Sequence, residues 1–127
     1  MYTDDRKLVH EELTYKLIGL AMQVHTTLGY GFLEKVYENA LMVLLRNNGI
    51  QAEQQVPIPV LFEGEKVGDY YADILVENKV VLELKAADSI VGHHRAQLLN
   101  YLKATGFRVG IILNFGGRKL EHERLVL

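Results

Sequence analysis

The chain has 127 residues, of which 49% are hydrophobic, and its formal net charge at pH 7 is −2. We expect a single domain spanning residues 1–127, because this length is enough to build one core. The sequence has no cysteine, which excludes disulfides, thiolate metal sites and iron–sulfur clusters, so a bound metal must use Asp, Glu, His or backbone oxygen. The small net charge argues against simple coating of nucleic acid but is compatible with an acidic site neutralised by metal ions. Residues 1–12 are charged, and no apolar run reaches about 18 residues. We therefore expect a soluble, cytoplasmic protein with no membrane partner.

Two helices are predicted in the first part of the chain. Apolar residues recur at helical spacing over residues 8–28, and Gly29 stands where a helix-terminating glycine is expected. Helical spacing resumes over residues 32–47, after the break at residues 29–31. We therefore expect a pair of helices joined by glycines.

The pattern then changes to that of strands, which are predicted over residues 50–62, 67–76, 80–86, 107–115 and 120–127. Pro57 and Pro59 restrict the first of these strands to a sheet edge. A third amphipathic helix is predicted over residues 93–105 and ends at Gly106. The order ααβββαββ, with a helical crossover between the third and fourth strands, indicates an α/β fold in which helices cover a mixed sheet.

Three charged residues interrupt two adjacent apolar strands: Asp73 in the first, and Glu83 and Lys85 in the second. Glu83 and Lys85 share a face, because they are two residues apart on an extended strand. A two-residue loop at residues 77–78 would pair Val76 with Lys79 and place Asp73 on the face away from Glu83. A three-residue loop at residues 77–79 would instead pair Val76 with Val80 and place Asp73 opposite Glu83.

The three-residue loop is favoured, because it leaves Lys79 outside the sheet and lets Asn78 or Lys79 adopt the positive φ that such loops need. The two carboxylates would then have Cβ atoms roughly 5 Å apart and would repel each other unless a cation lay between them, a requirement that hard divalent ions meet. The plainer interpretation is that Asp73 projects into solvent and that Glu83 and Lys85 form a surface ion pair.

Polar residues also follow helical spacing in two helices. Glu34 and Tyr37 lie on one face at the start of the second helix. His94, Gln97 and Tyr101 form one stripe on the third helix. Either set can be an ordinary solvent-facing rim, and histidines such as His25 and His94 on largely apolar helices are more often structural than ligands.

Residues 31–37 read Gly-Phe-Leu-Glu-Lys-Val-Tyr and match the pattern GxxExxY. They are followed in order by Asp73-x9-Glu83-x-Lys85 and by Gln97-x3-Tyr101. On these motifs the chain resembles the GxxExxY family of small bacterial and archaeal proteins, which is assigned to the PD-(D/E)XK nuclease superfamily. Ala72 stands where the superfamily name places proline, a position that carries no ligand atom.

The resemblance implies a restriction-endonuclease-like fold and a role for each motif residue. Asp73 and Glu83 would bind Mg²⁺ or Mn²⁺ together with Glu34 and the backbone carbonyl of Leu84. Lys85 would hold the attacking water, and Gln97 and Tyr101 would bind the phosphate or orient Lys85. Tyr37, His94 and His25 would support the site. Candidates for contacts with backbone phosphates are Arg95, Lys103, Arg108, Arg118 and Lys119.

The expected function is Mg²⁺-dependent hydrolysis of phosphodiester bonds in nucleic acid, with DNA as the expected substrate, by a domain small enough to act as a homodimer. The alternative is a catalytically inactive nucleic-acid- or protein-binding module on the nuclease fold. A purely structural domain is the third interpretation, and it requires the carboxylates of Asp73 and Glu83 to lie more than about 8 Å apart, too far to share one ion.

Overall fold

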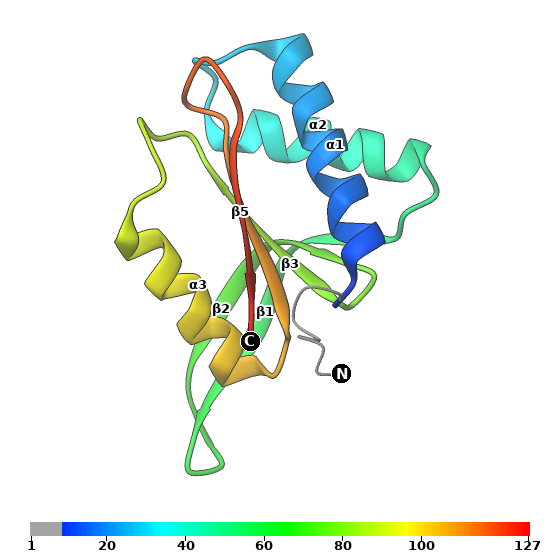
Figure 1. Ribbon diagram of the computed structural model, residues 1–127. Helices are drawn as coiled ribbons and strands as arrows, with labels where there is room; N and C mark the ends of the chain where they lie inside the picture. Colours follow the sequence, from blue (N-terminus) through cyan, green and yellow to red (C-terminus); the bar gives the residue numbers. More distant parts are fainter. Residues whose placement is uncertain (1–8) are drawn as a thin grey trace, which may run out of the picture.

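The computed structural model describes residues 9–127, which form three helices on the two faces of a five-stranded sheet (Figure 1). In chain order the elements are α1 (Glu11–Leu28), α2 (Glu34–Asn47), β1 (Ala52–Phe62), β2 (Glu65–Val76), β3 (Val80–Lys85), α3 (Gly92–Thr105), β4 (Val109–Asn114) and β5 (Glu121–Val126). The predicted order ααβββαββ is therefore confirmed.

The sheet is mixed and its strands lie in sequence order, β1-β2-β3-β4-β5. Strands β3 and β4 pair in parallel, while the other neighbours pair antiparallel. The parallel pair requires a crossover connection, and α3 provides it. This topology confirms the prediction of an α/β fold with a mixed sheet.

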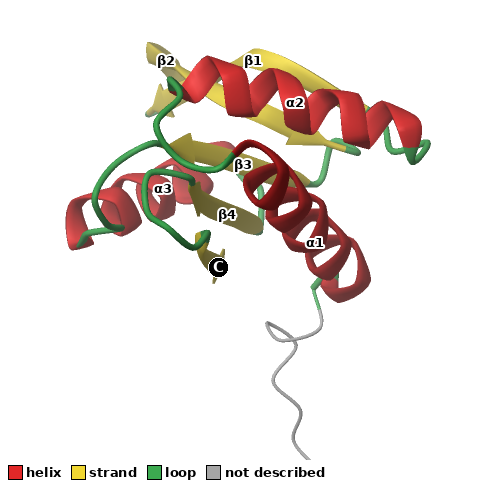
Figure 2. Cartoon of the chain, turned by 90° about the horizontal axis from the view of Figure 1, so that it is seen from above, coloured by secondary structure: helices red, strands yellow, loops and turns green. Residues whose placement is uncertain are grey.

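Helices cover both faces of the sheet, so the core has two parts. Helices α1 and α2 pack on one face, where Leu82 and Leu84 of β3 are buried, and α3 packs on the other, where Val81 is buried (Figure 2). Successive strand residues point to opposite faces, so β3 is buried on both sides. Its charged residues therefore lie within an otherwise apolar strand, where charge is costly unless it is compensated.

The helix starts differ from the predicted ones. The predicted start of the first helix, Leu8, lies outside the described residues; Val9 and His10 form a turn, and α1 begins at Glu11. Helix α2 begins two residues later than predicted, because Gly31 has φ +108° and Leu33 is extended at the N-cap. Glu34 is consequently the first residue of α2, where the helix dipole favours an acidic side chain.

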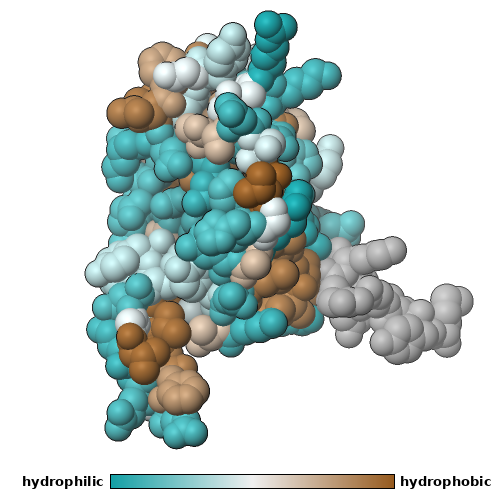
Figure 3. All heavy atoms as spheres, turned by 90° about the vertical axis from the view of Figure 1, so that its left-hand side faces the viewer, coloured by the Kyte–Doolittle hydropathy of each residue, from teal (hydrophilic) through white to brown (hydrophobic). Residues whose placement is uncertain are grey.

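Strand β1 forms a sheet edge, as its prolines predict, and the β1–β2 hairpin projects away from the helices (Figure 1). Exposed apolar side chains gather near the end of this hairpin (Figure 3), and those with the largest exposed fractions there are Phe62, Val67 and Leu61. In the part of the chain that the structure describes, no helix has the length and apolar character needed to cross a membrane.

Candidate active site at the ends of β2 and β3

The register of β2 and β3 resolves the two loop alternatives. Val76 pairs with Val80 and Ile74 with Leu82, so the loop has three residues, as predicted, and the two-residue alternative is excluded. Asn78 has the expected positive φ of 53°, and Glu77 has the same value, which the sequence did not indicate. The paired register ends one residue before Asp73 and Glu83, and the side-chain alternation of β2 is interrupted there, because Ile74 is buried toward α1 and α2 whereas Ala72 is buried toward α3.

Backbone pairing between β2 and β3 ends at Ile74 and Leu82. Beyond it, the Asp73 side chain replaces the backbone as the hydrogen-bond acceptor for β3. The Leu84 N–H donates to Asp73 Oδ2 at 2.8 Å. Since Leu82 and Leu84 are buried beneath α1 and α2, Glu83 and Lys85 point to the opposite face of β3. Asp73, Glu83 and Lys85 thus lie near one another where the two strands separate: the Asp73 backbone hydrogen-bonds to Glu83, and the charge of Lys85 lowers the pKa of both carboxyl groups.

The buried carboxylate of Glu38 is linked to Asp73 through the side-chain amide of Gln55. The Gln55 side chain donates from Nε2 to Glu38 Oε1 at 2.9 Å and to Asp73 Oδ1 at 3.3 Å. Glu38 is only 4% exposed and also accepts hydrogen bonds from Lys35 (2.8 Å) and Gln54 (2.6 Å). Gln55 has φ +51°, a conformation that non-glycine residues seldom adopt, so its position is determined by these contacts.

Sequence reasoning missed both Glu38 and Gln55. One signal was available for Glu38, because its spacing from the apolar residues Leu41 and Leu45 places it on the buried face of α2. For Gln55 there was none, since its role depends on contacts with α2 and β2 that are distant in sequence.

Glu83 is connected to α3 through an aromatic pair. The hydroxyl of Tyr70 on β2 donates to Glu83 Oε1, and the Tyr70 ring stacks on Tyr101 with centroids 3.6 Å apart. The Gln97 amide donates to the Tyr101 hydroxyl at 3.4 Å. The predicted Gln97–Tyr101 stripe is therefore linked to Glu83 through Tyr70. The sequence position of Tyr70 on its strand did not indicate this role.

Both carboxyl groups have raised pKa values. Burial raises the pKa of Glu83 to about 7, opposed by the charge of Lys85 and by the Asp73 backbone, while the negative charges of Glu34 and Glu38 raise it further. Burial also raises the pKa of Asp73, and Glu38 adds to this, whereas the Leu84 N–H, Gln55 and Lys85 lower it. The charge of Lys85 therefore does not fully compensate the acidic pair.

The predicted supporting residue His94 caps α3. Its Nδ1 accepts a hydrogen bond from the Val91 N–H at 3.2 Å. Burial lowers the His94 pKa, and the positive charge of Lys85 lowers it further. The neutral ring is thus favoured, which agrees with a ring nitrogen acting as acceptor.

The other two supporting residues, Tyr37 and His25, hold loops in place. The Tyr37 hydroxyl donates to the Gly29 carbonyl at 2.7 Å and accepts the Phe32 N–H at 3.2 Å. His25 Nε2 lies 2.8 Å from the Gly117 carbonyl oxygen, and the rings of both residues contact Phe115. They fix the loop at residues 29–33 and the loop after β4.

The basic residues proposed for phosphate contacts lie in different surroundings. Arg95 on α3 forms an ion pair of 2.5 Å with Glu123 on β5. Arg108 donates two hydrogen bonds of 3.3 Å to the Leu127 carbonyl. Lys103 is exposed on α3.

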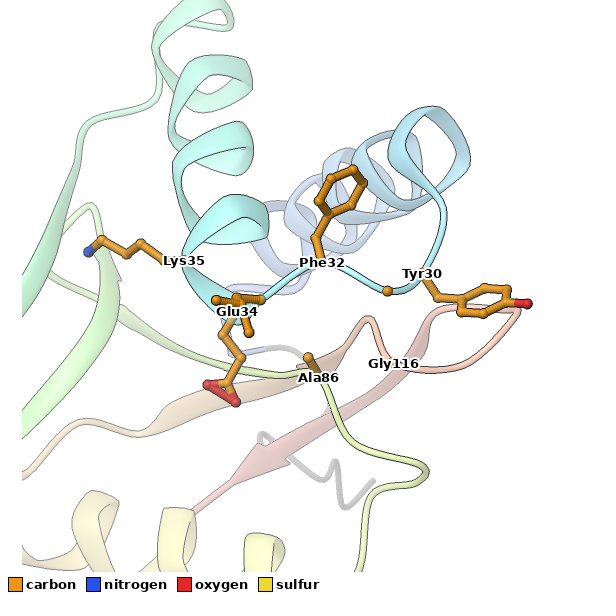
Figure 4. A pocket seen from close by; sticks show the side chains of 8 residues that line it. Tyr30, Phe32, Glu34, Lys35, Ala86 and Gly116 are labelled. Atoms are coloured by element: carbon orange, nitrogen blue, oxygen red, sulfur yellow. The ribbon is translucent and has the colours of Figure 1, made fainter.

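Glu34 lines a cleft of about 600 Å³ between the start of α2 and the chain that leaves β3 (Figure 4). Lys35, Ala86 and Gly116 also line it. Figure 4 shows the Glu34 carboxylate directed past Ala86, whereas the Tyr30 ring extends in the opposite direction. Because Ala86 directly follows Lys85, this cleft adjoins the carboxylate pair.

The donor set suits a hard divalent ion. Within residues 9–127 no three Asp, Glu or His side chains converge to hold an ion, so Glu34 is not gathered with Asp73 and Glu83 into a three-ligand cluster. Mg²⁺ needs fewer protein ligands, since it commonly binds one or two carboxylates and completes its shell with water and substrate phosphates. The carboxyl groups of Asp73 and Glu83 and the backbone carbonyl of Leu84 are oxygen donors of the kind that such an ion prefers.

Comparisons with known proteins concern the fold and the family. The chain is similar to the crystal structure of SSO0001, with 22% sequence identity and a TM-score of 0.57, over 95% of this chain and 61% of that one. It therefore spans less than two thirds of that protein, and the likeness concerns the fold. A search of curated proteins gives no match. The family description "PD-(D/E)XK nuclease superfamily" matches residues 11–125, and so the chain belongs to the PD-(D/E)XK nuclease superfamily.

Proposed function

We propose that the protein is a metal-dependent nuclease that hydrolyses phosphodiester bonds in nucleic acid, with DNA as the expected substrate and Mg²⁺ or Mn²⁺ as cofactor. The observation that supports this most is the contact of Asp73 with the Glu83–Leu84 segment just beyond the β2–β3 ladder, with Lys85 on the same face of β3 as Glu83. The pattern at residues 31–37 supports a more specific place in the GxxExxY family.

Asp73, Glu83 and the Leu84 carbonyl are proposed to hold the ion, and Glu34 to contact its water shell from the adjoining cleft. The ion would neutralise charge on the phosphoryl oxygens and make a bound water more acidic. Lys85 would donate a hydrogen bond to that water or to the phosphate and so hold the two in line. Tyr70 would keep Glu83 oriented, because its hydroxyl donates to the Glu83 carboxyl group. Tyr101 would hold Tyr70 in place by stacking on its ring.

A nucleic-acid-binding module without turnover is the second candidate. It is favoured by the hydrogen bonds that already occupy both oxygens of Asp73, and by the lack of a three-ligand cluster within residues 9–127. This candidate and the nuclease differ in one outcome, which is whether bound nucleic acid is cut when a divalent ion is present.

The test is cleavage of labelled single-stranded, duplex and branched DNA, and of RNA, with Mg²⁺, with Mn²⁺ and with EDTA. We expect cleavage by the wild type only with a divalent ion, and a loss of at least about a hundredfold in Asp73→Asn, Glu83→Gln and Lys85→Ala. Glu53→Gln, at an exposed position on β1, is the matched control and should cleave normally. Activity that survives in all three site variants would refute the mechanism, and binding without cleavage would favour the second candidate.

A further inference from the structure

A second cleft, of about 590 Å³, lies next to the cleft that Glu34 lines. Tyr30 lines both clefts, and Arg118 and Lys119, from the loop after β4, line the second one. We refer to this second space as the Tyr30 cleft. Because the two clefts share Tyr30, the Tyr30 cleft neighbours the cleft beside Glu34.

The Tyr30 cleft combines an exposed ring with positive charge. The Tyr30 side chain is 58% exposed, and Figure 4 shows its ring extending away from Glu34. Arg118 and Lys119 are both exposed, and neither takes part in an ion pair within residues 9–127. Among the described residues no acidic side chain lines the cleft. Its charge is therefore complementary to a phosphate.

Buried contacts hold the two walls of the cleft in place. The Tyr37 hydroxyl ties down the backbone on either side of Tyr30, at Gly29 and at Phe32. His25 holds the carbonyl of Gly117, the residue before Arg118. Both tethering side chains are buried, so the ring and the cations need little ordering when a ligand binds.

We infer that the Tyr30 cleft binds an unpaired nucleic-acid strand, with a base stacked on Tyr30 and its phosphates beside Arg118 and Lys119. An exposed aromatic ring next to cations is the arrangement by which proteins hold single strands without reading sequence. A duplex does not satisfy it, because the faces of paired bases are already stacked inside the helix. The inference rests on the proposed function, since it assigns single-stranded nucleic acid, or an unpaired end, as the substrate class of the adjoining site.

The test is the affinity for a labelled oligothymidine of about ten nucleotides, measured by fluorescence anisotropy in EDTA. Tyr30→Ala should weaken binding about tenfold, whereas Tyr30→Phe, which keeps the ring, should bind as the wild type does. Tyr15→Ala is the matched control, because Tyr15 is an exposed tyrosine on α1 that lines neither cleft. The double variant Arg118→Ala/Lys119→Ala should reduce the slope of log K against log salt by about 1.4.

The outcomes separate this inference from the proposed function. Unchanged affinity in Tyr30→Ala, or equal losses in Tyr30→Ala and Tyr15→Ala, would overturn the inference, even if the wild type cleaves DNA. Preference of the wild type for a duplex of the same length would also overturn it. Binding that depends on Tyr30 without cleavage under any divalent ion would leave the inference standing and refute the nuclease.

Discussion

Neutralising Glu83 should stabilise the metal-free protein at alkaline pH. Burial raises the pKa of this carboxyl group from its ordinary value of 4.5 to about 7. Each pKa unit corresponds to about 1.4 kcal/mol, so this difference corresponds to roughly 3 kcal/mol of folding free energy. Because the folded-state pKa is the higher one, the contribution favours folding fully below pH 4.5 and is lost as the pH rises through about 7.

The assay is urea unfolding in EDTA at pH 5 and at pH 8. Between these values the free energy of unfolding of the wild type should fall by ~2 kcal/mol more than that of Glu83→Gln, which cannot ionise and keeps an oxygen for the Tyr70 hydroxyl. Glu53→Gln, exposed on β1, should follow the wild type. Parallel pH dependence in the wild type and Glu83→Gln would show that the pKa of Glu83 is not raised in the folded protein.

The same unfolding assay with Mg²⁺ tests whether Glu83 binds the ion. At pH 8 a saturating concentration should stabilise the wild type, by about 2.7 kcal/mol at a hundred times Kd, because only the folded state assembles the donor set. Glu83→Gln has one carboxylate fewer and should gain much less. Equal stabilisation of the two proteins would place the ion elsewhere.

Three further substitutions test the contacts around the site. Gln55→Ala removes a donor from Asp73, so it should raise the Asp73 pKa and weaken Mn²⁺ binding at pH 7 about tenfold by calorimetry; unchanged affinity would contradict this. Tyr37→Phe keeps the ring but loses both hydroxyl contacts, and should lower the free energy of unfolding by about 1–3 kcal/mol; no change in urea unfolding would show that these contacts are not needed. Gly116→Ala should lower the free energy of unfolding by about 3 kcal/mol in the same assay, because the added Cβ would lie 2.1 Å from the backbone oxygen of Ala87. Gly117→Ala is the control and should be close to neutral, because its nearest contact would be at 3.5 Å. Equal effects of the two substitutions would argue against the close approach of Gly116 to Ala87.

Local signals in the sequence were sufficient for the parts of the site that lie on one hairpin. The register of β2 and β3 follows from a single decision on loop length, and side-chain alternation then places Glu83 and Lys85 on one face. The sheet edge at β1 was equally predictable, because proline has no N–H to donate to a neighbouring strand.

The remaining contacts could not be derived in this way. The bridge from Glu38 through Gln55 to Asp73 joins α2, β1 and β2, and Gln55 adopts a left-handed conformation that its residue type does not favour. The stacking of Tyr70 on Tyr101 likewise depends on how α3 crosses the sheet. Such contacts depend on packing between elements that are distant in sequence. The spacing of apolar residues along the sequence describes only one helix or strand at a time.

The most direct test of the central claim, that Asp73 and Glu83 jointly hold a divalent ion, is anomalous diffraction from crystals soaked in Mn²⁺. We expect a peak within ligand distance of a carboxylate oxygen of each residue and of the Leu84 carbonyl, and no peak there in Asp73→Asn crystals. A wild-type crystal with no peak between the two carboxylates at saturating Mn²⁺, or a peak that persists in Asp73→Asn, would contradict it.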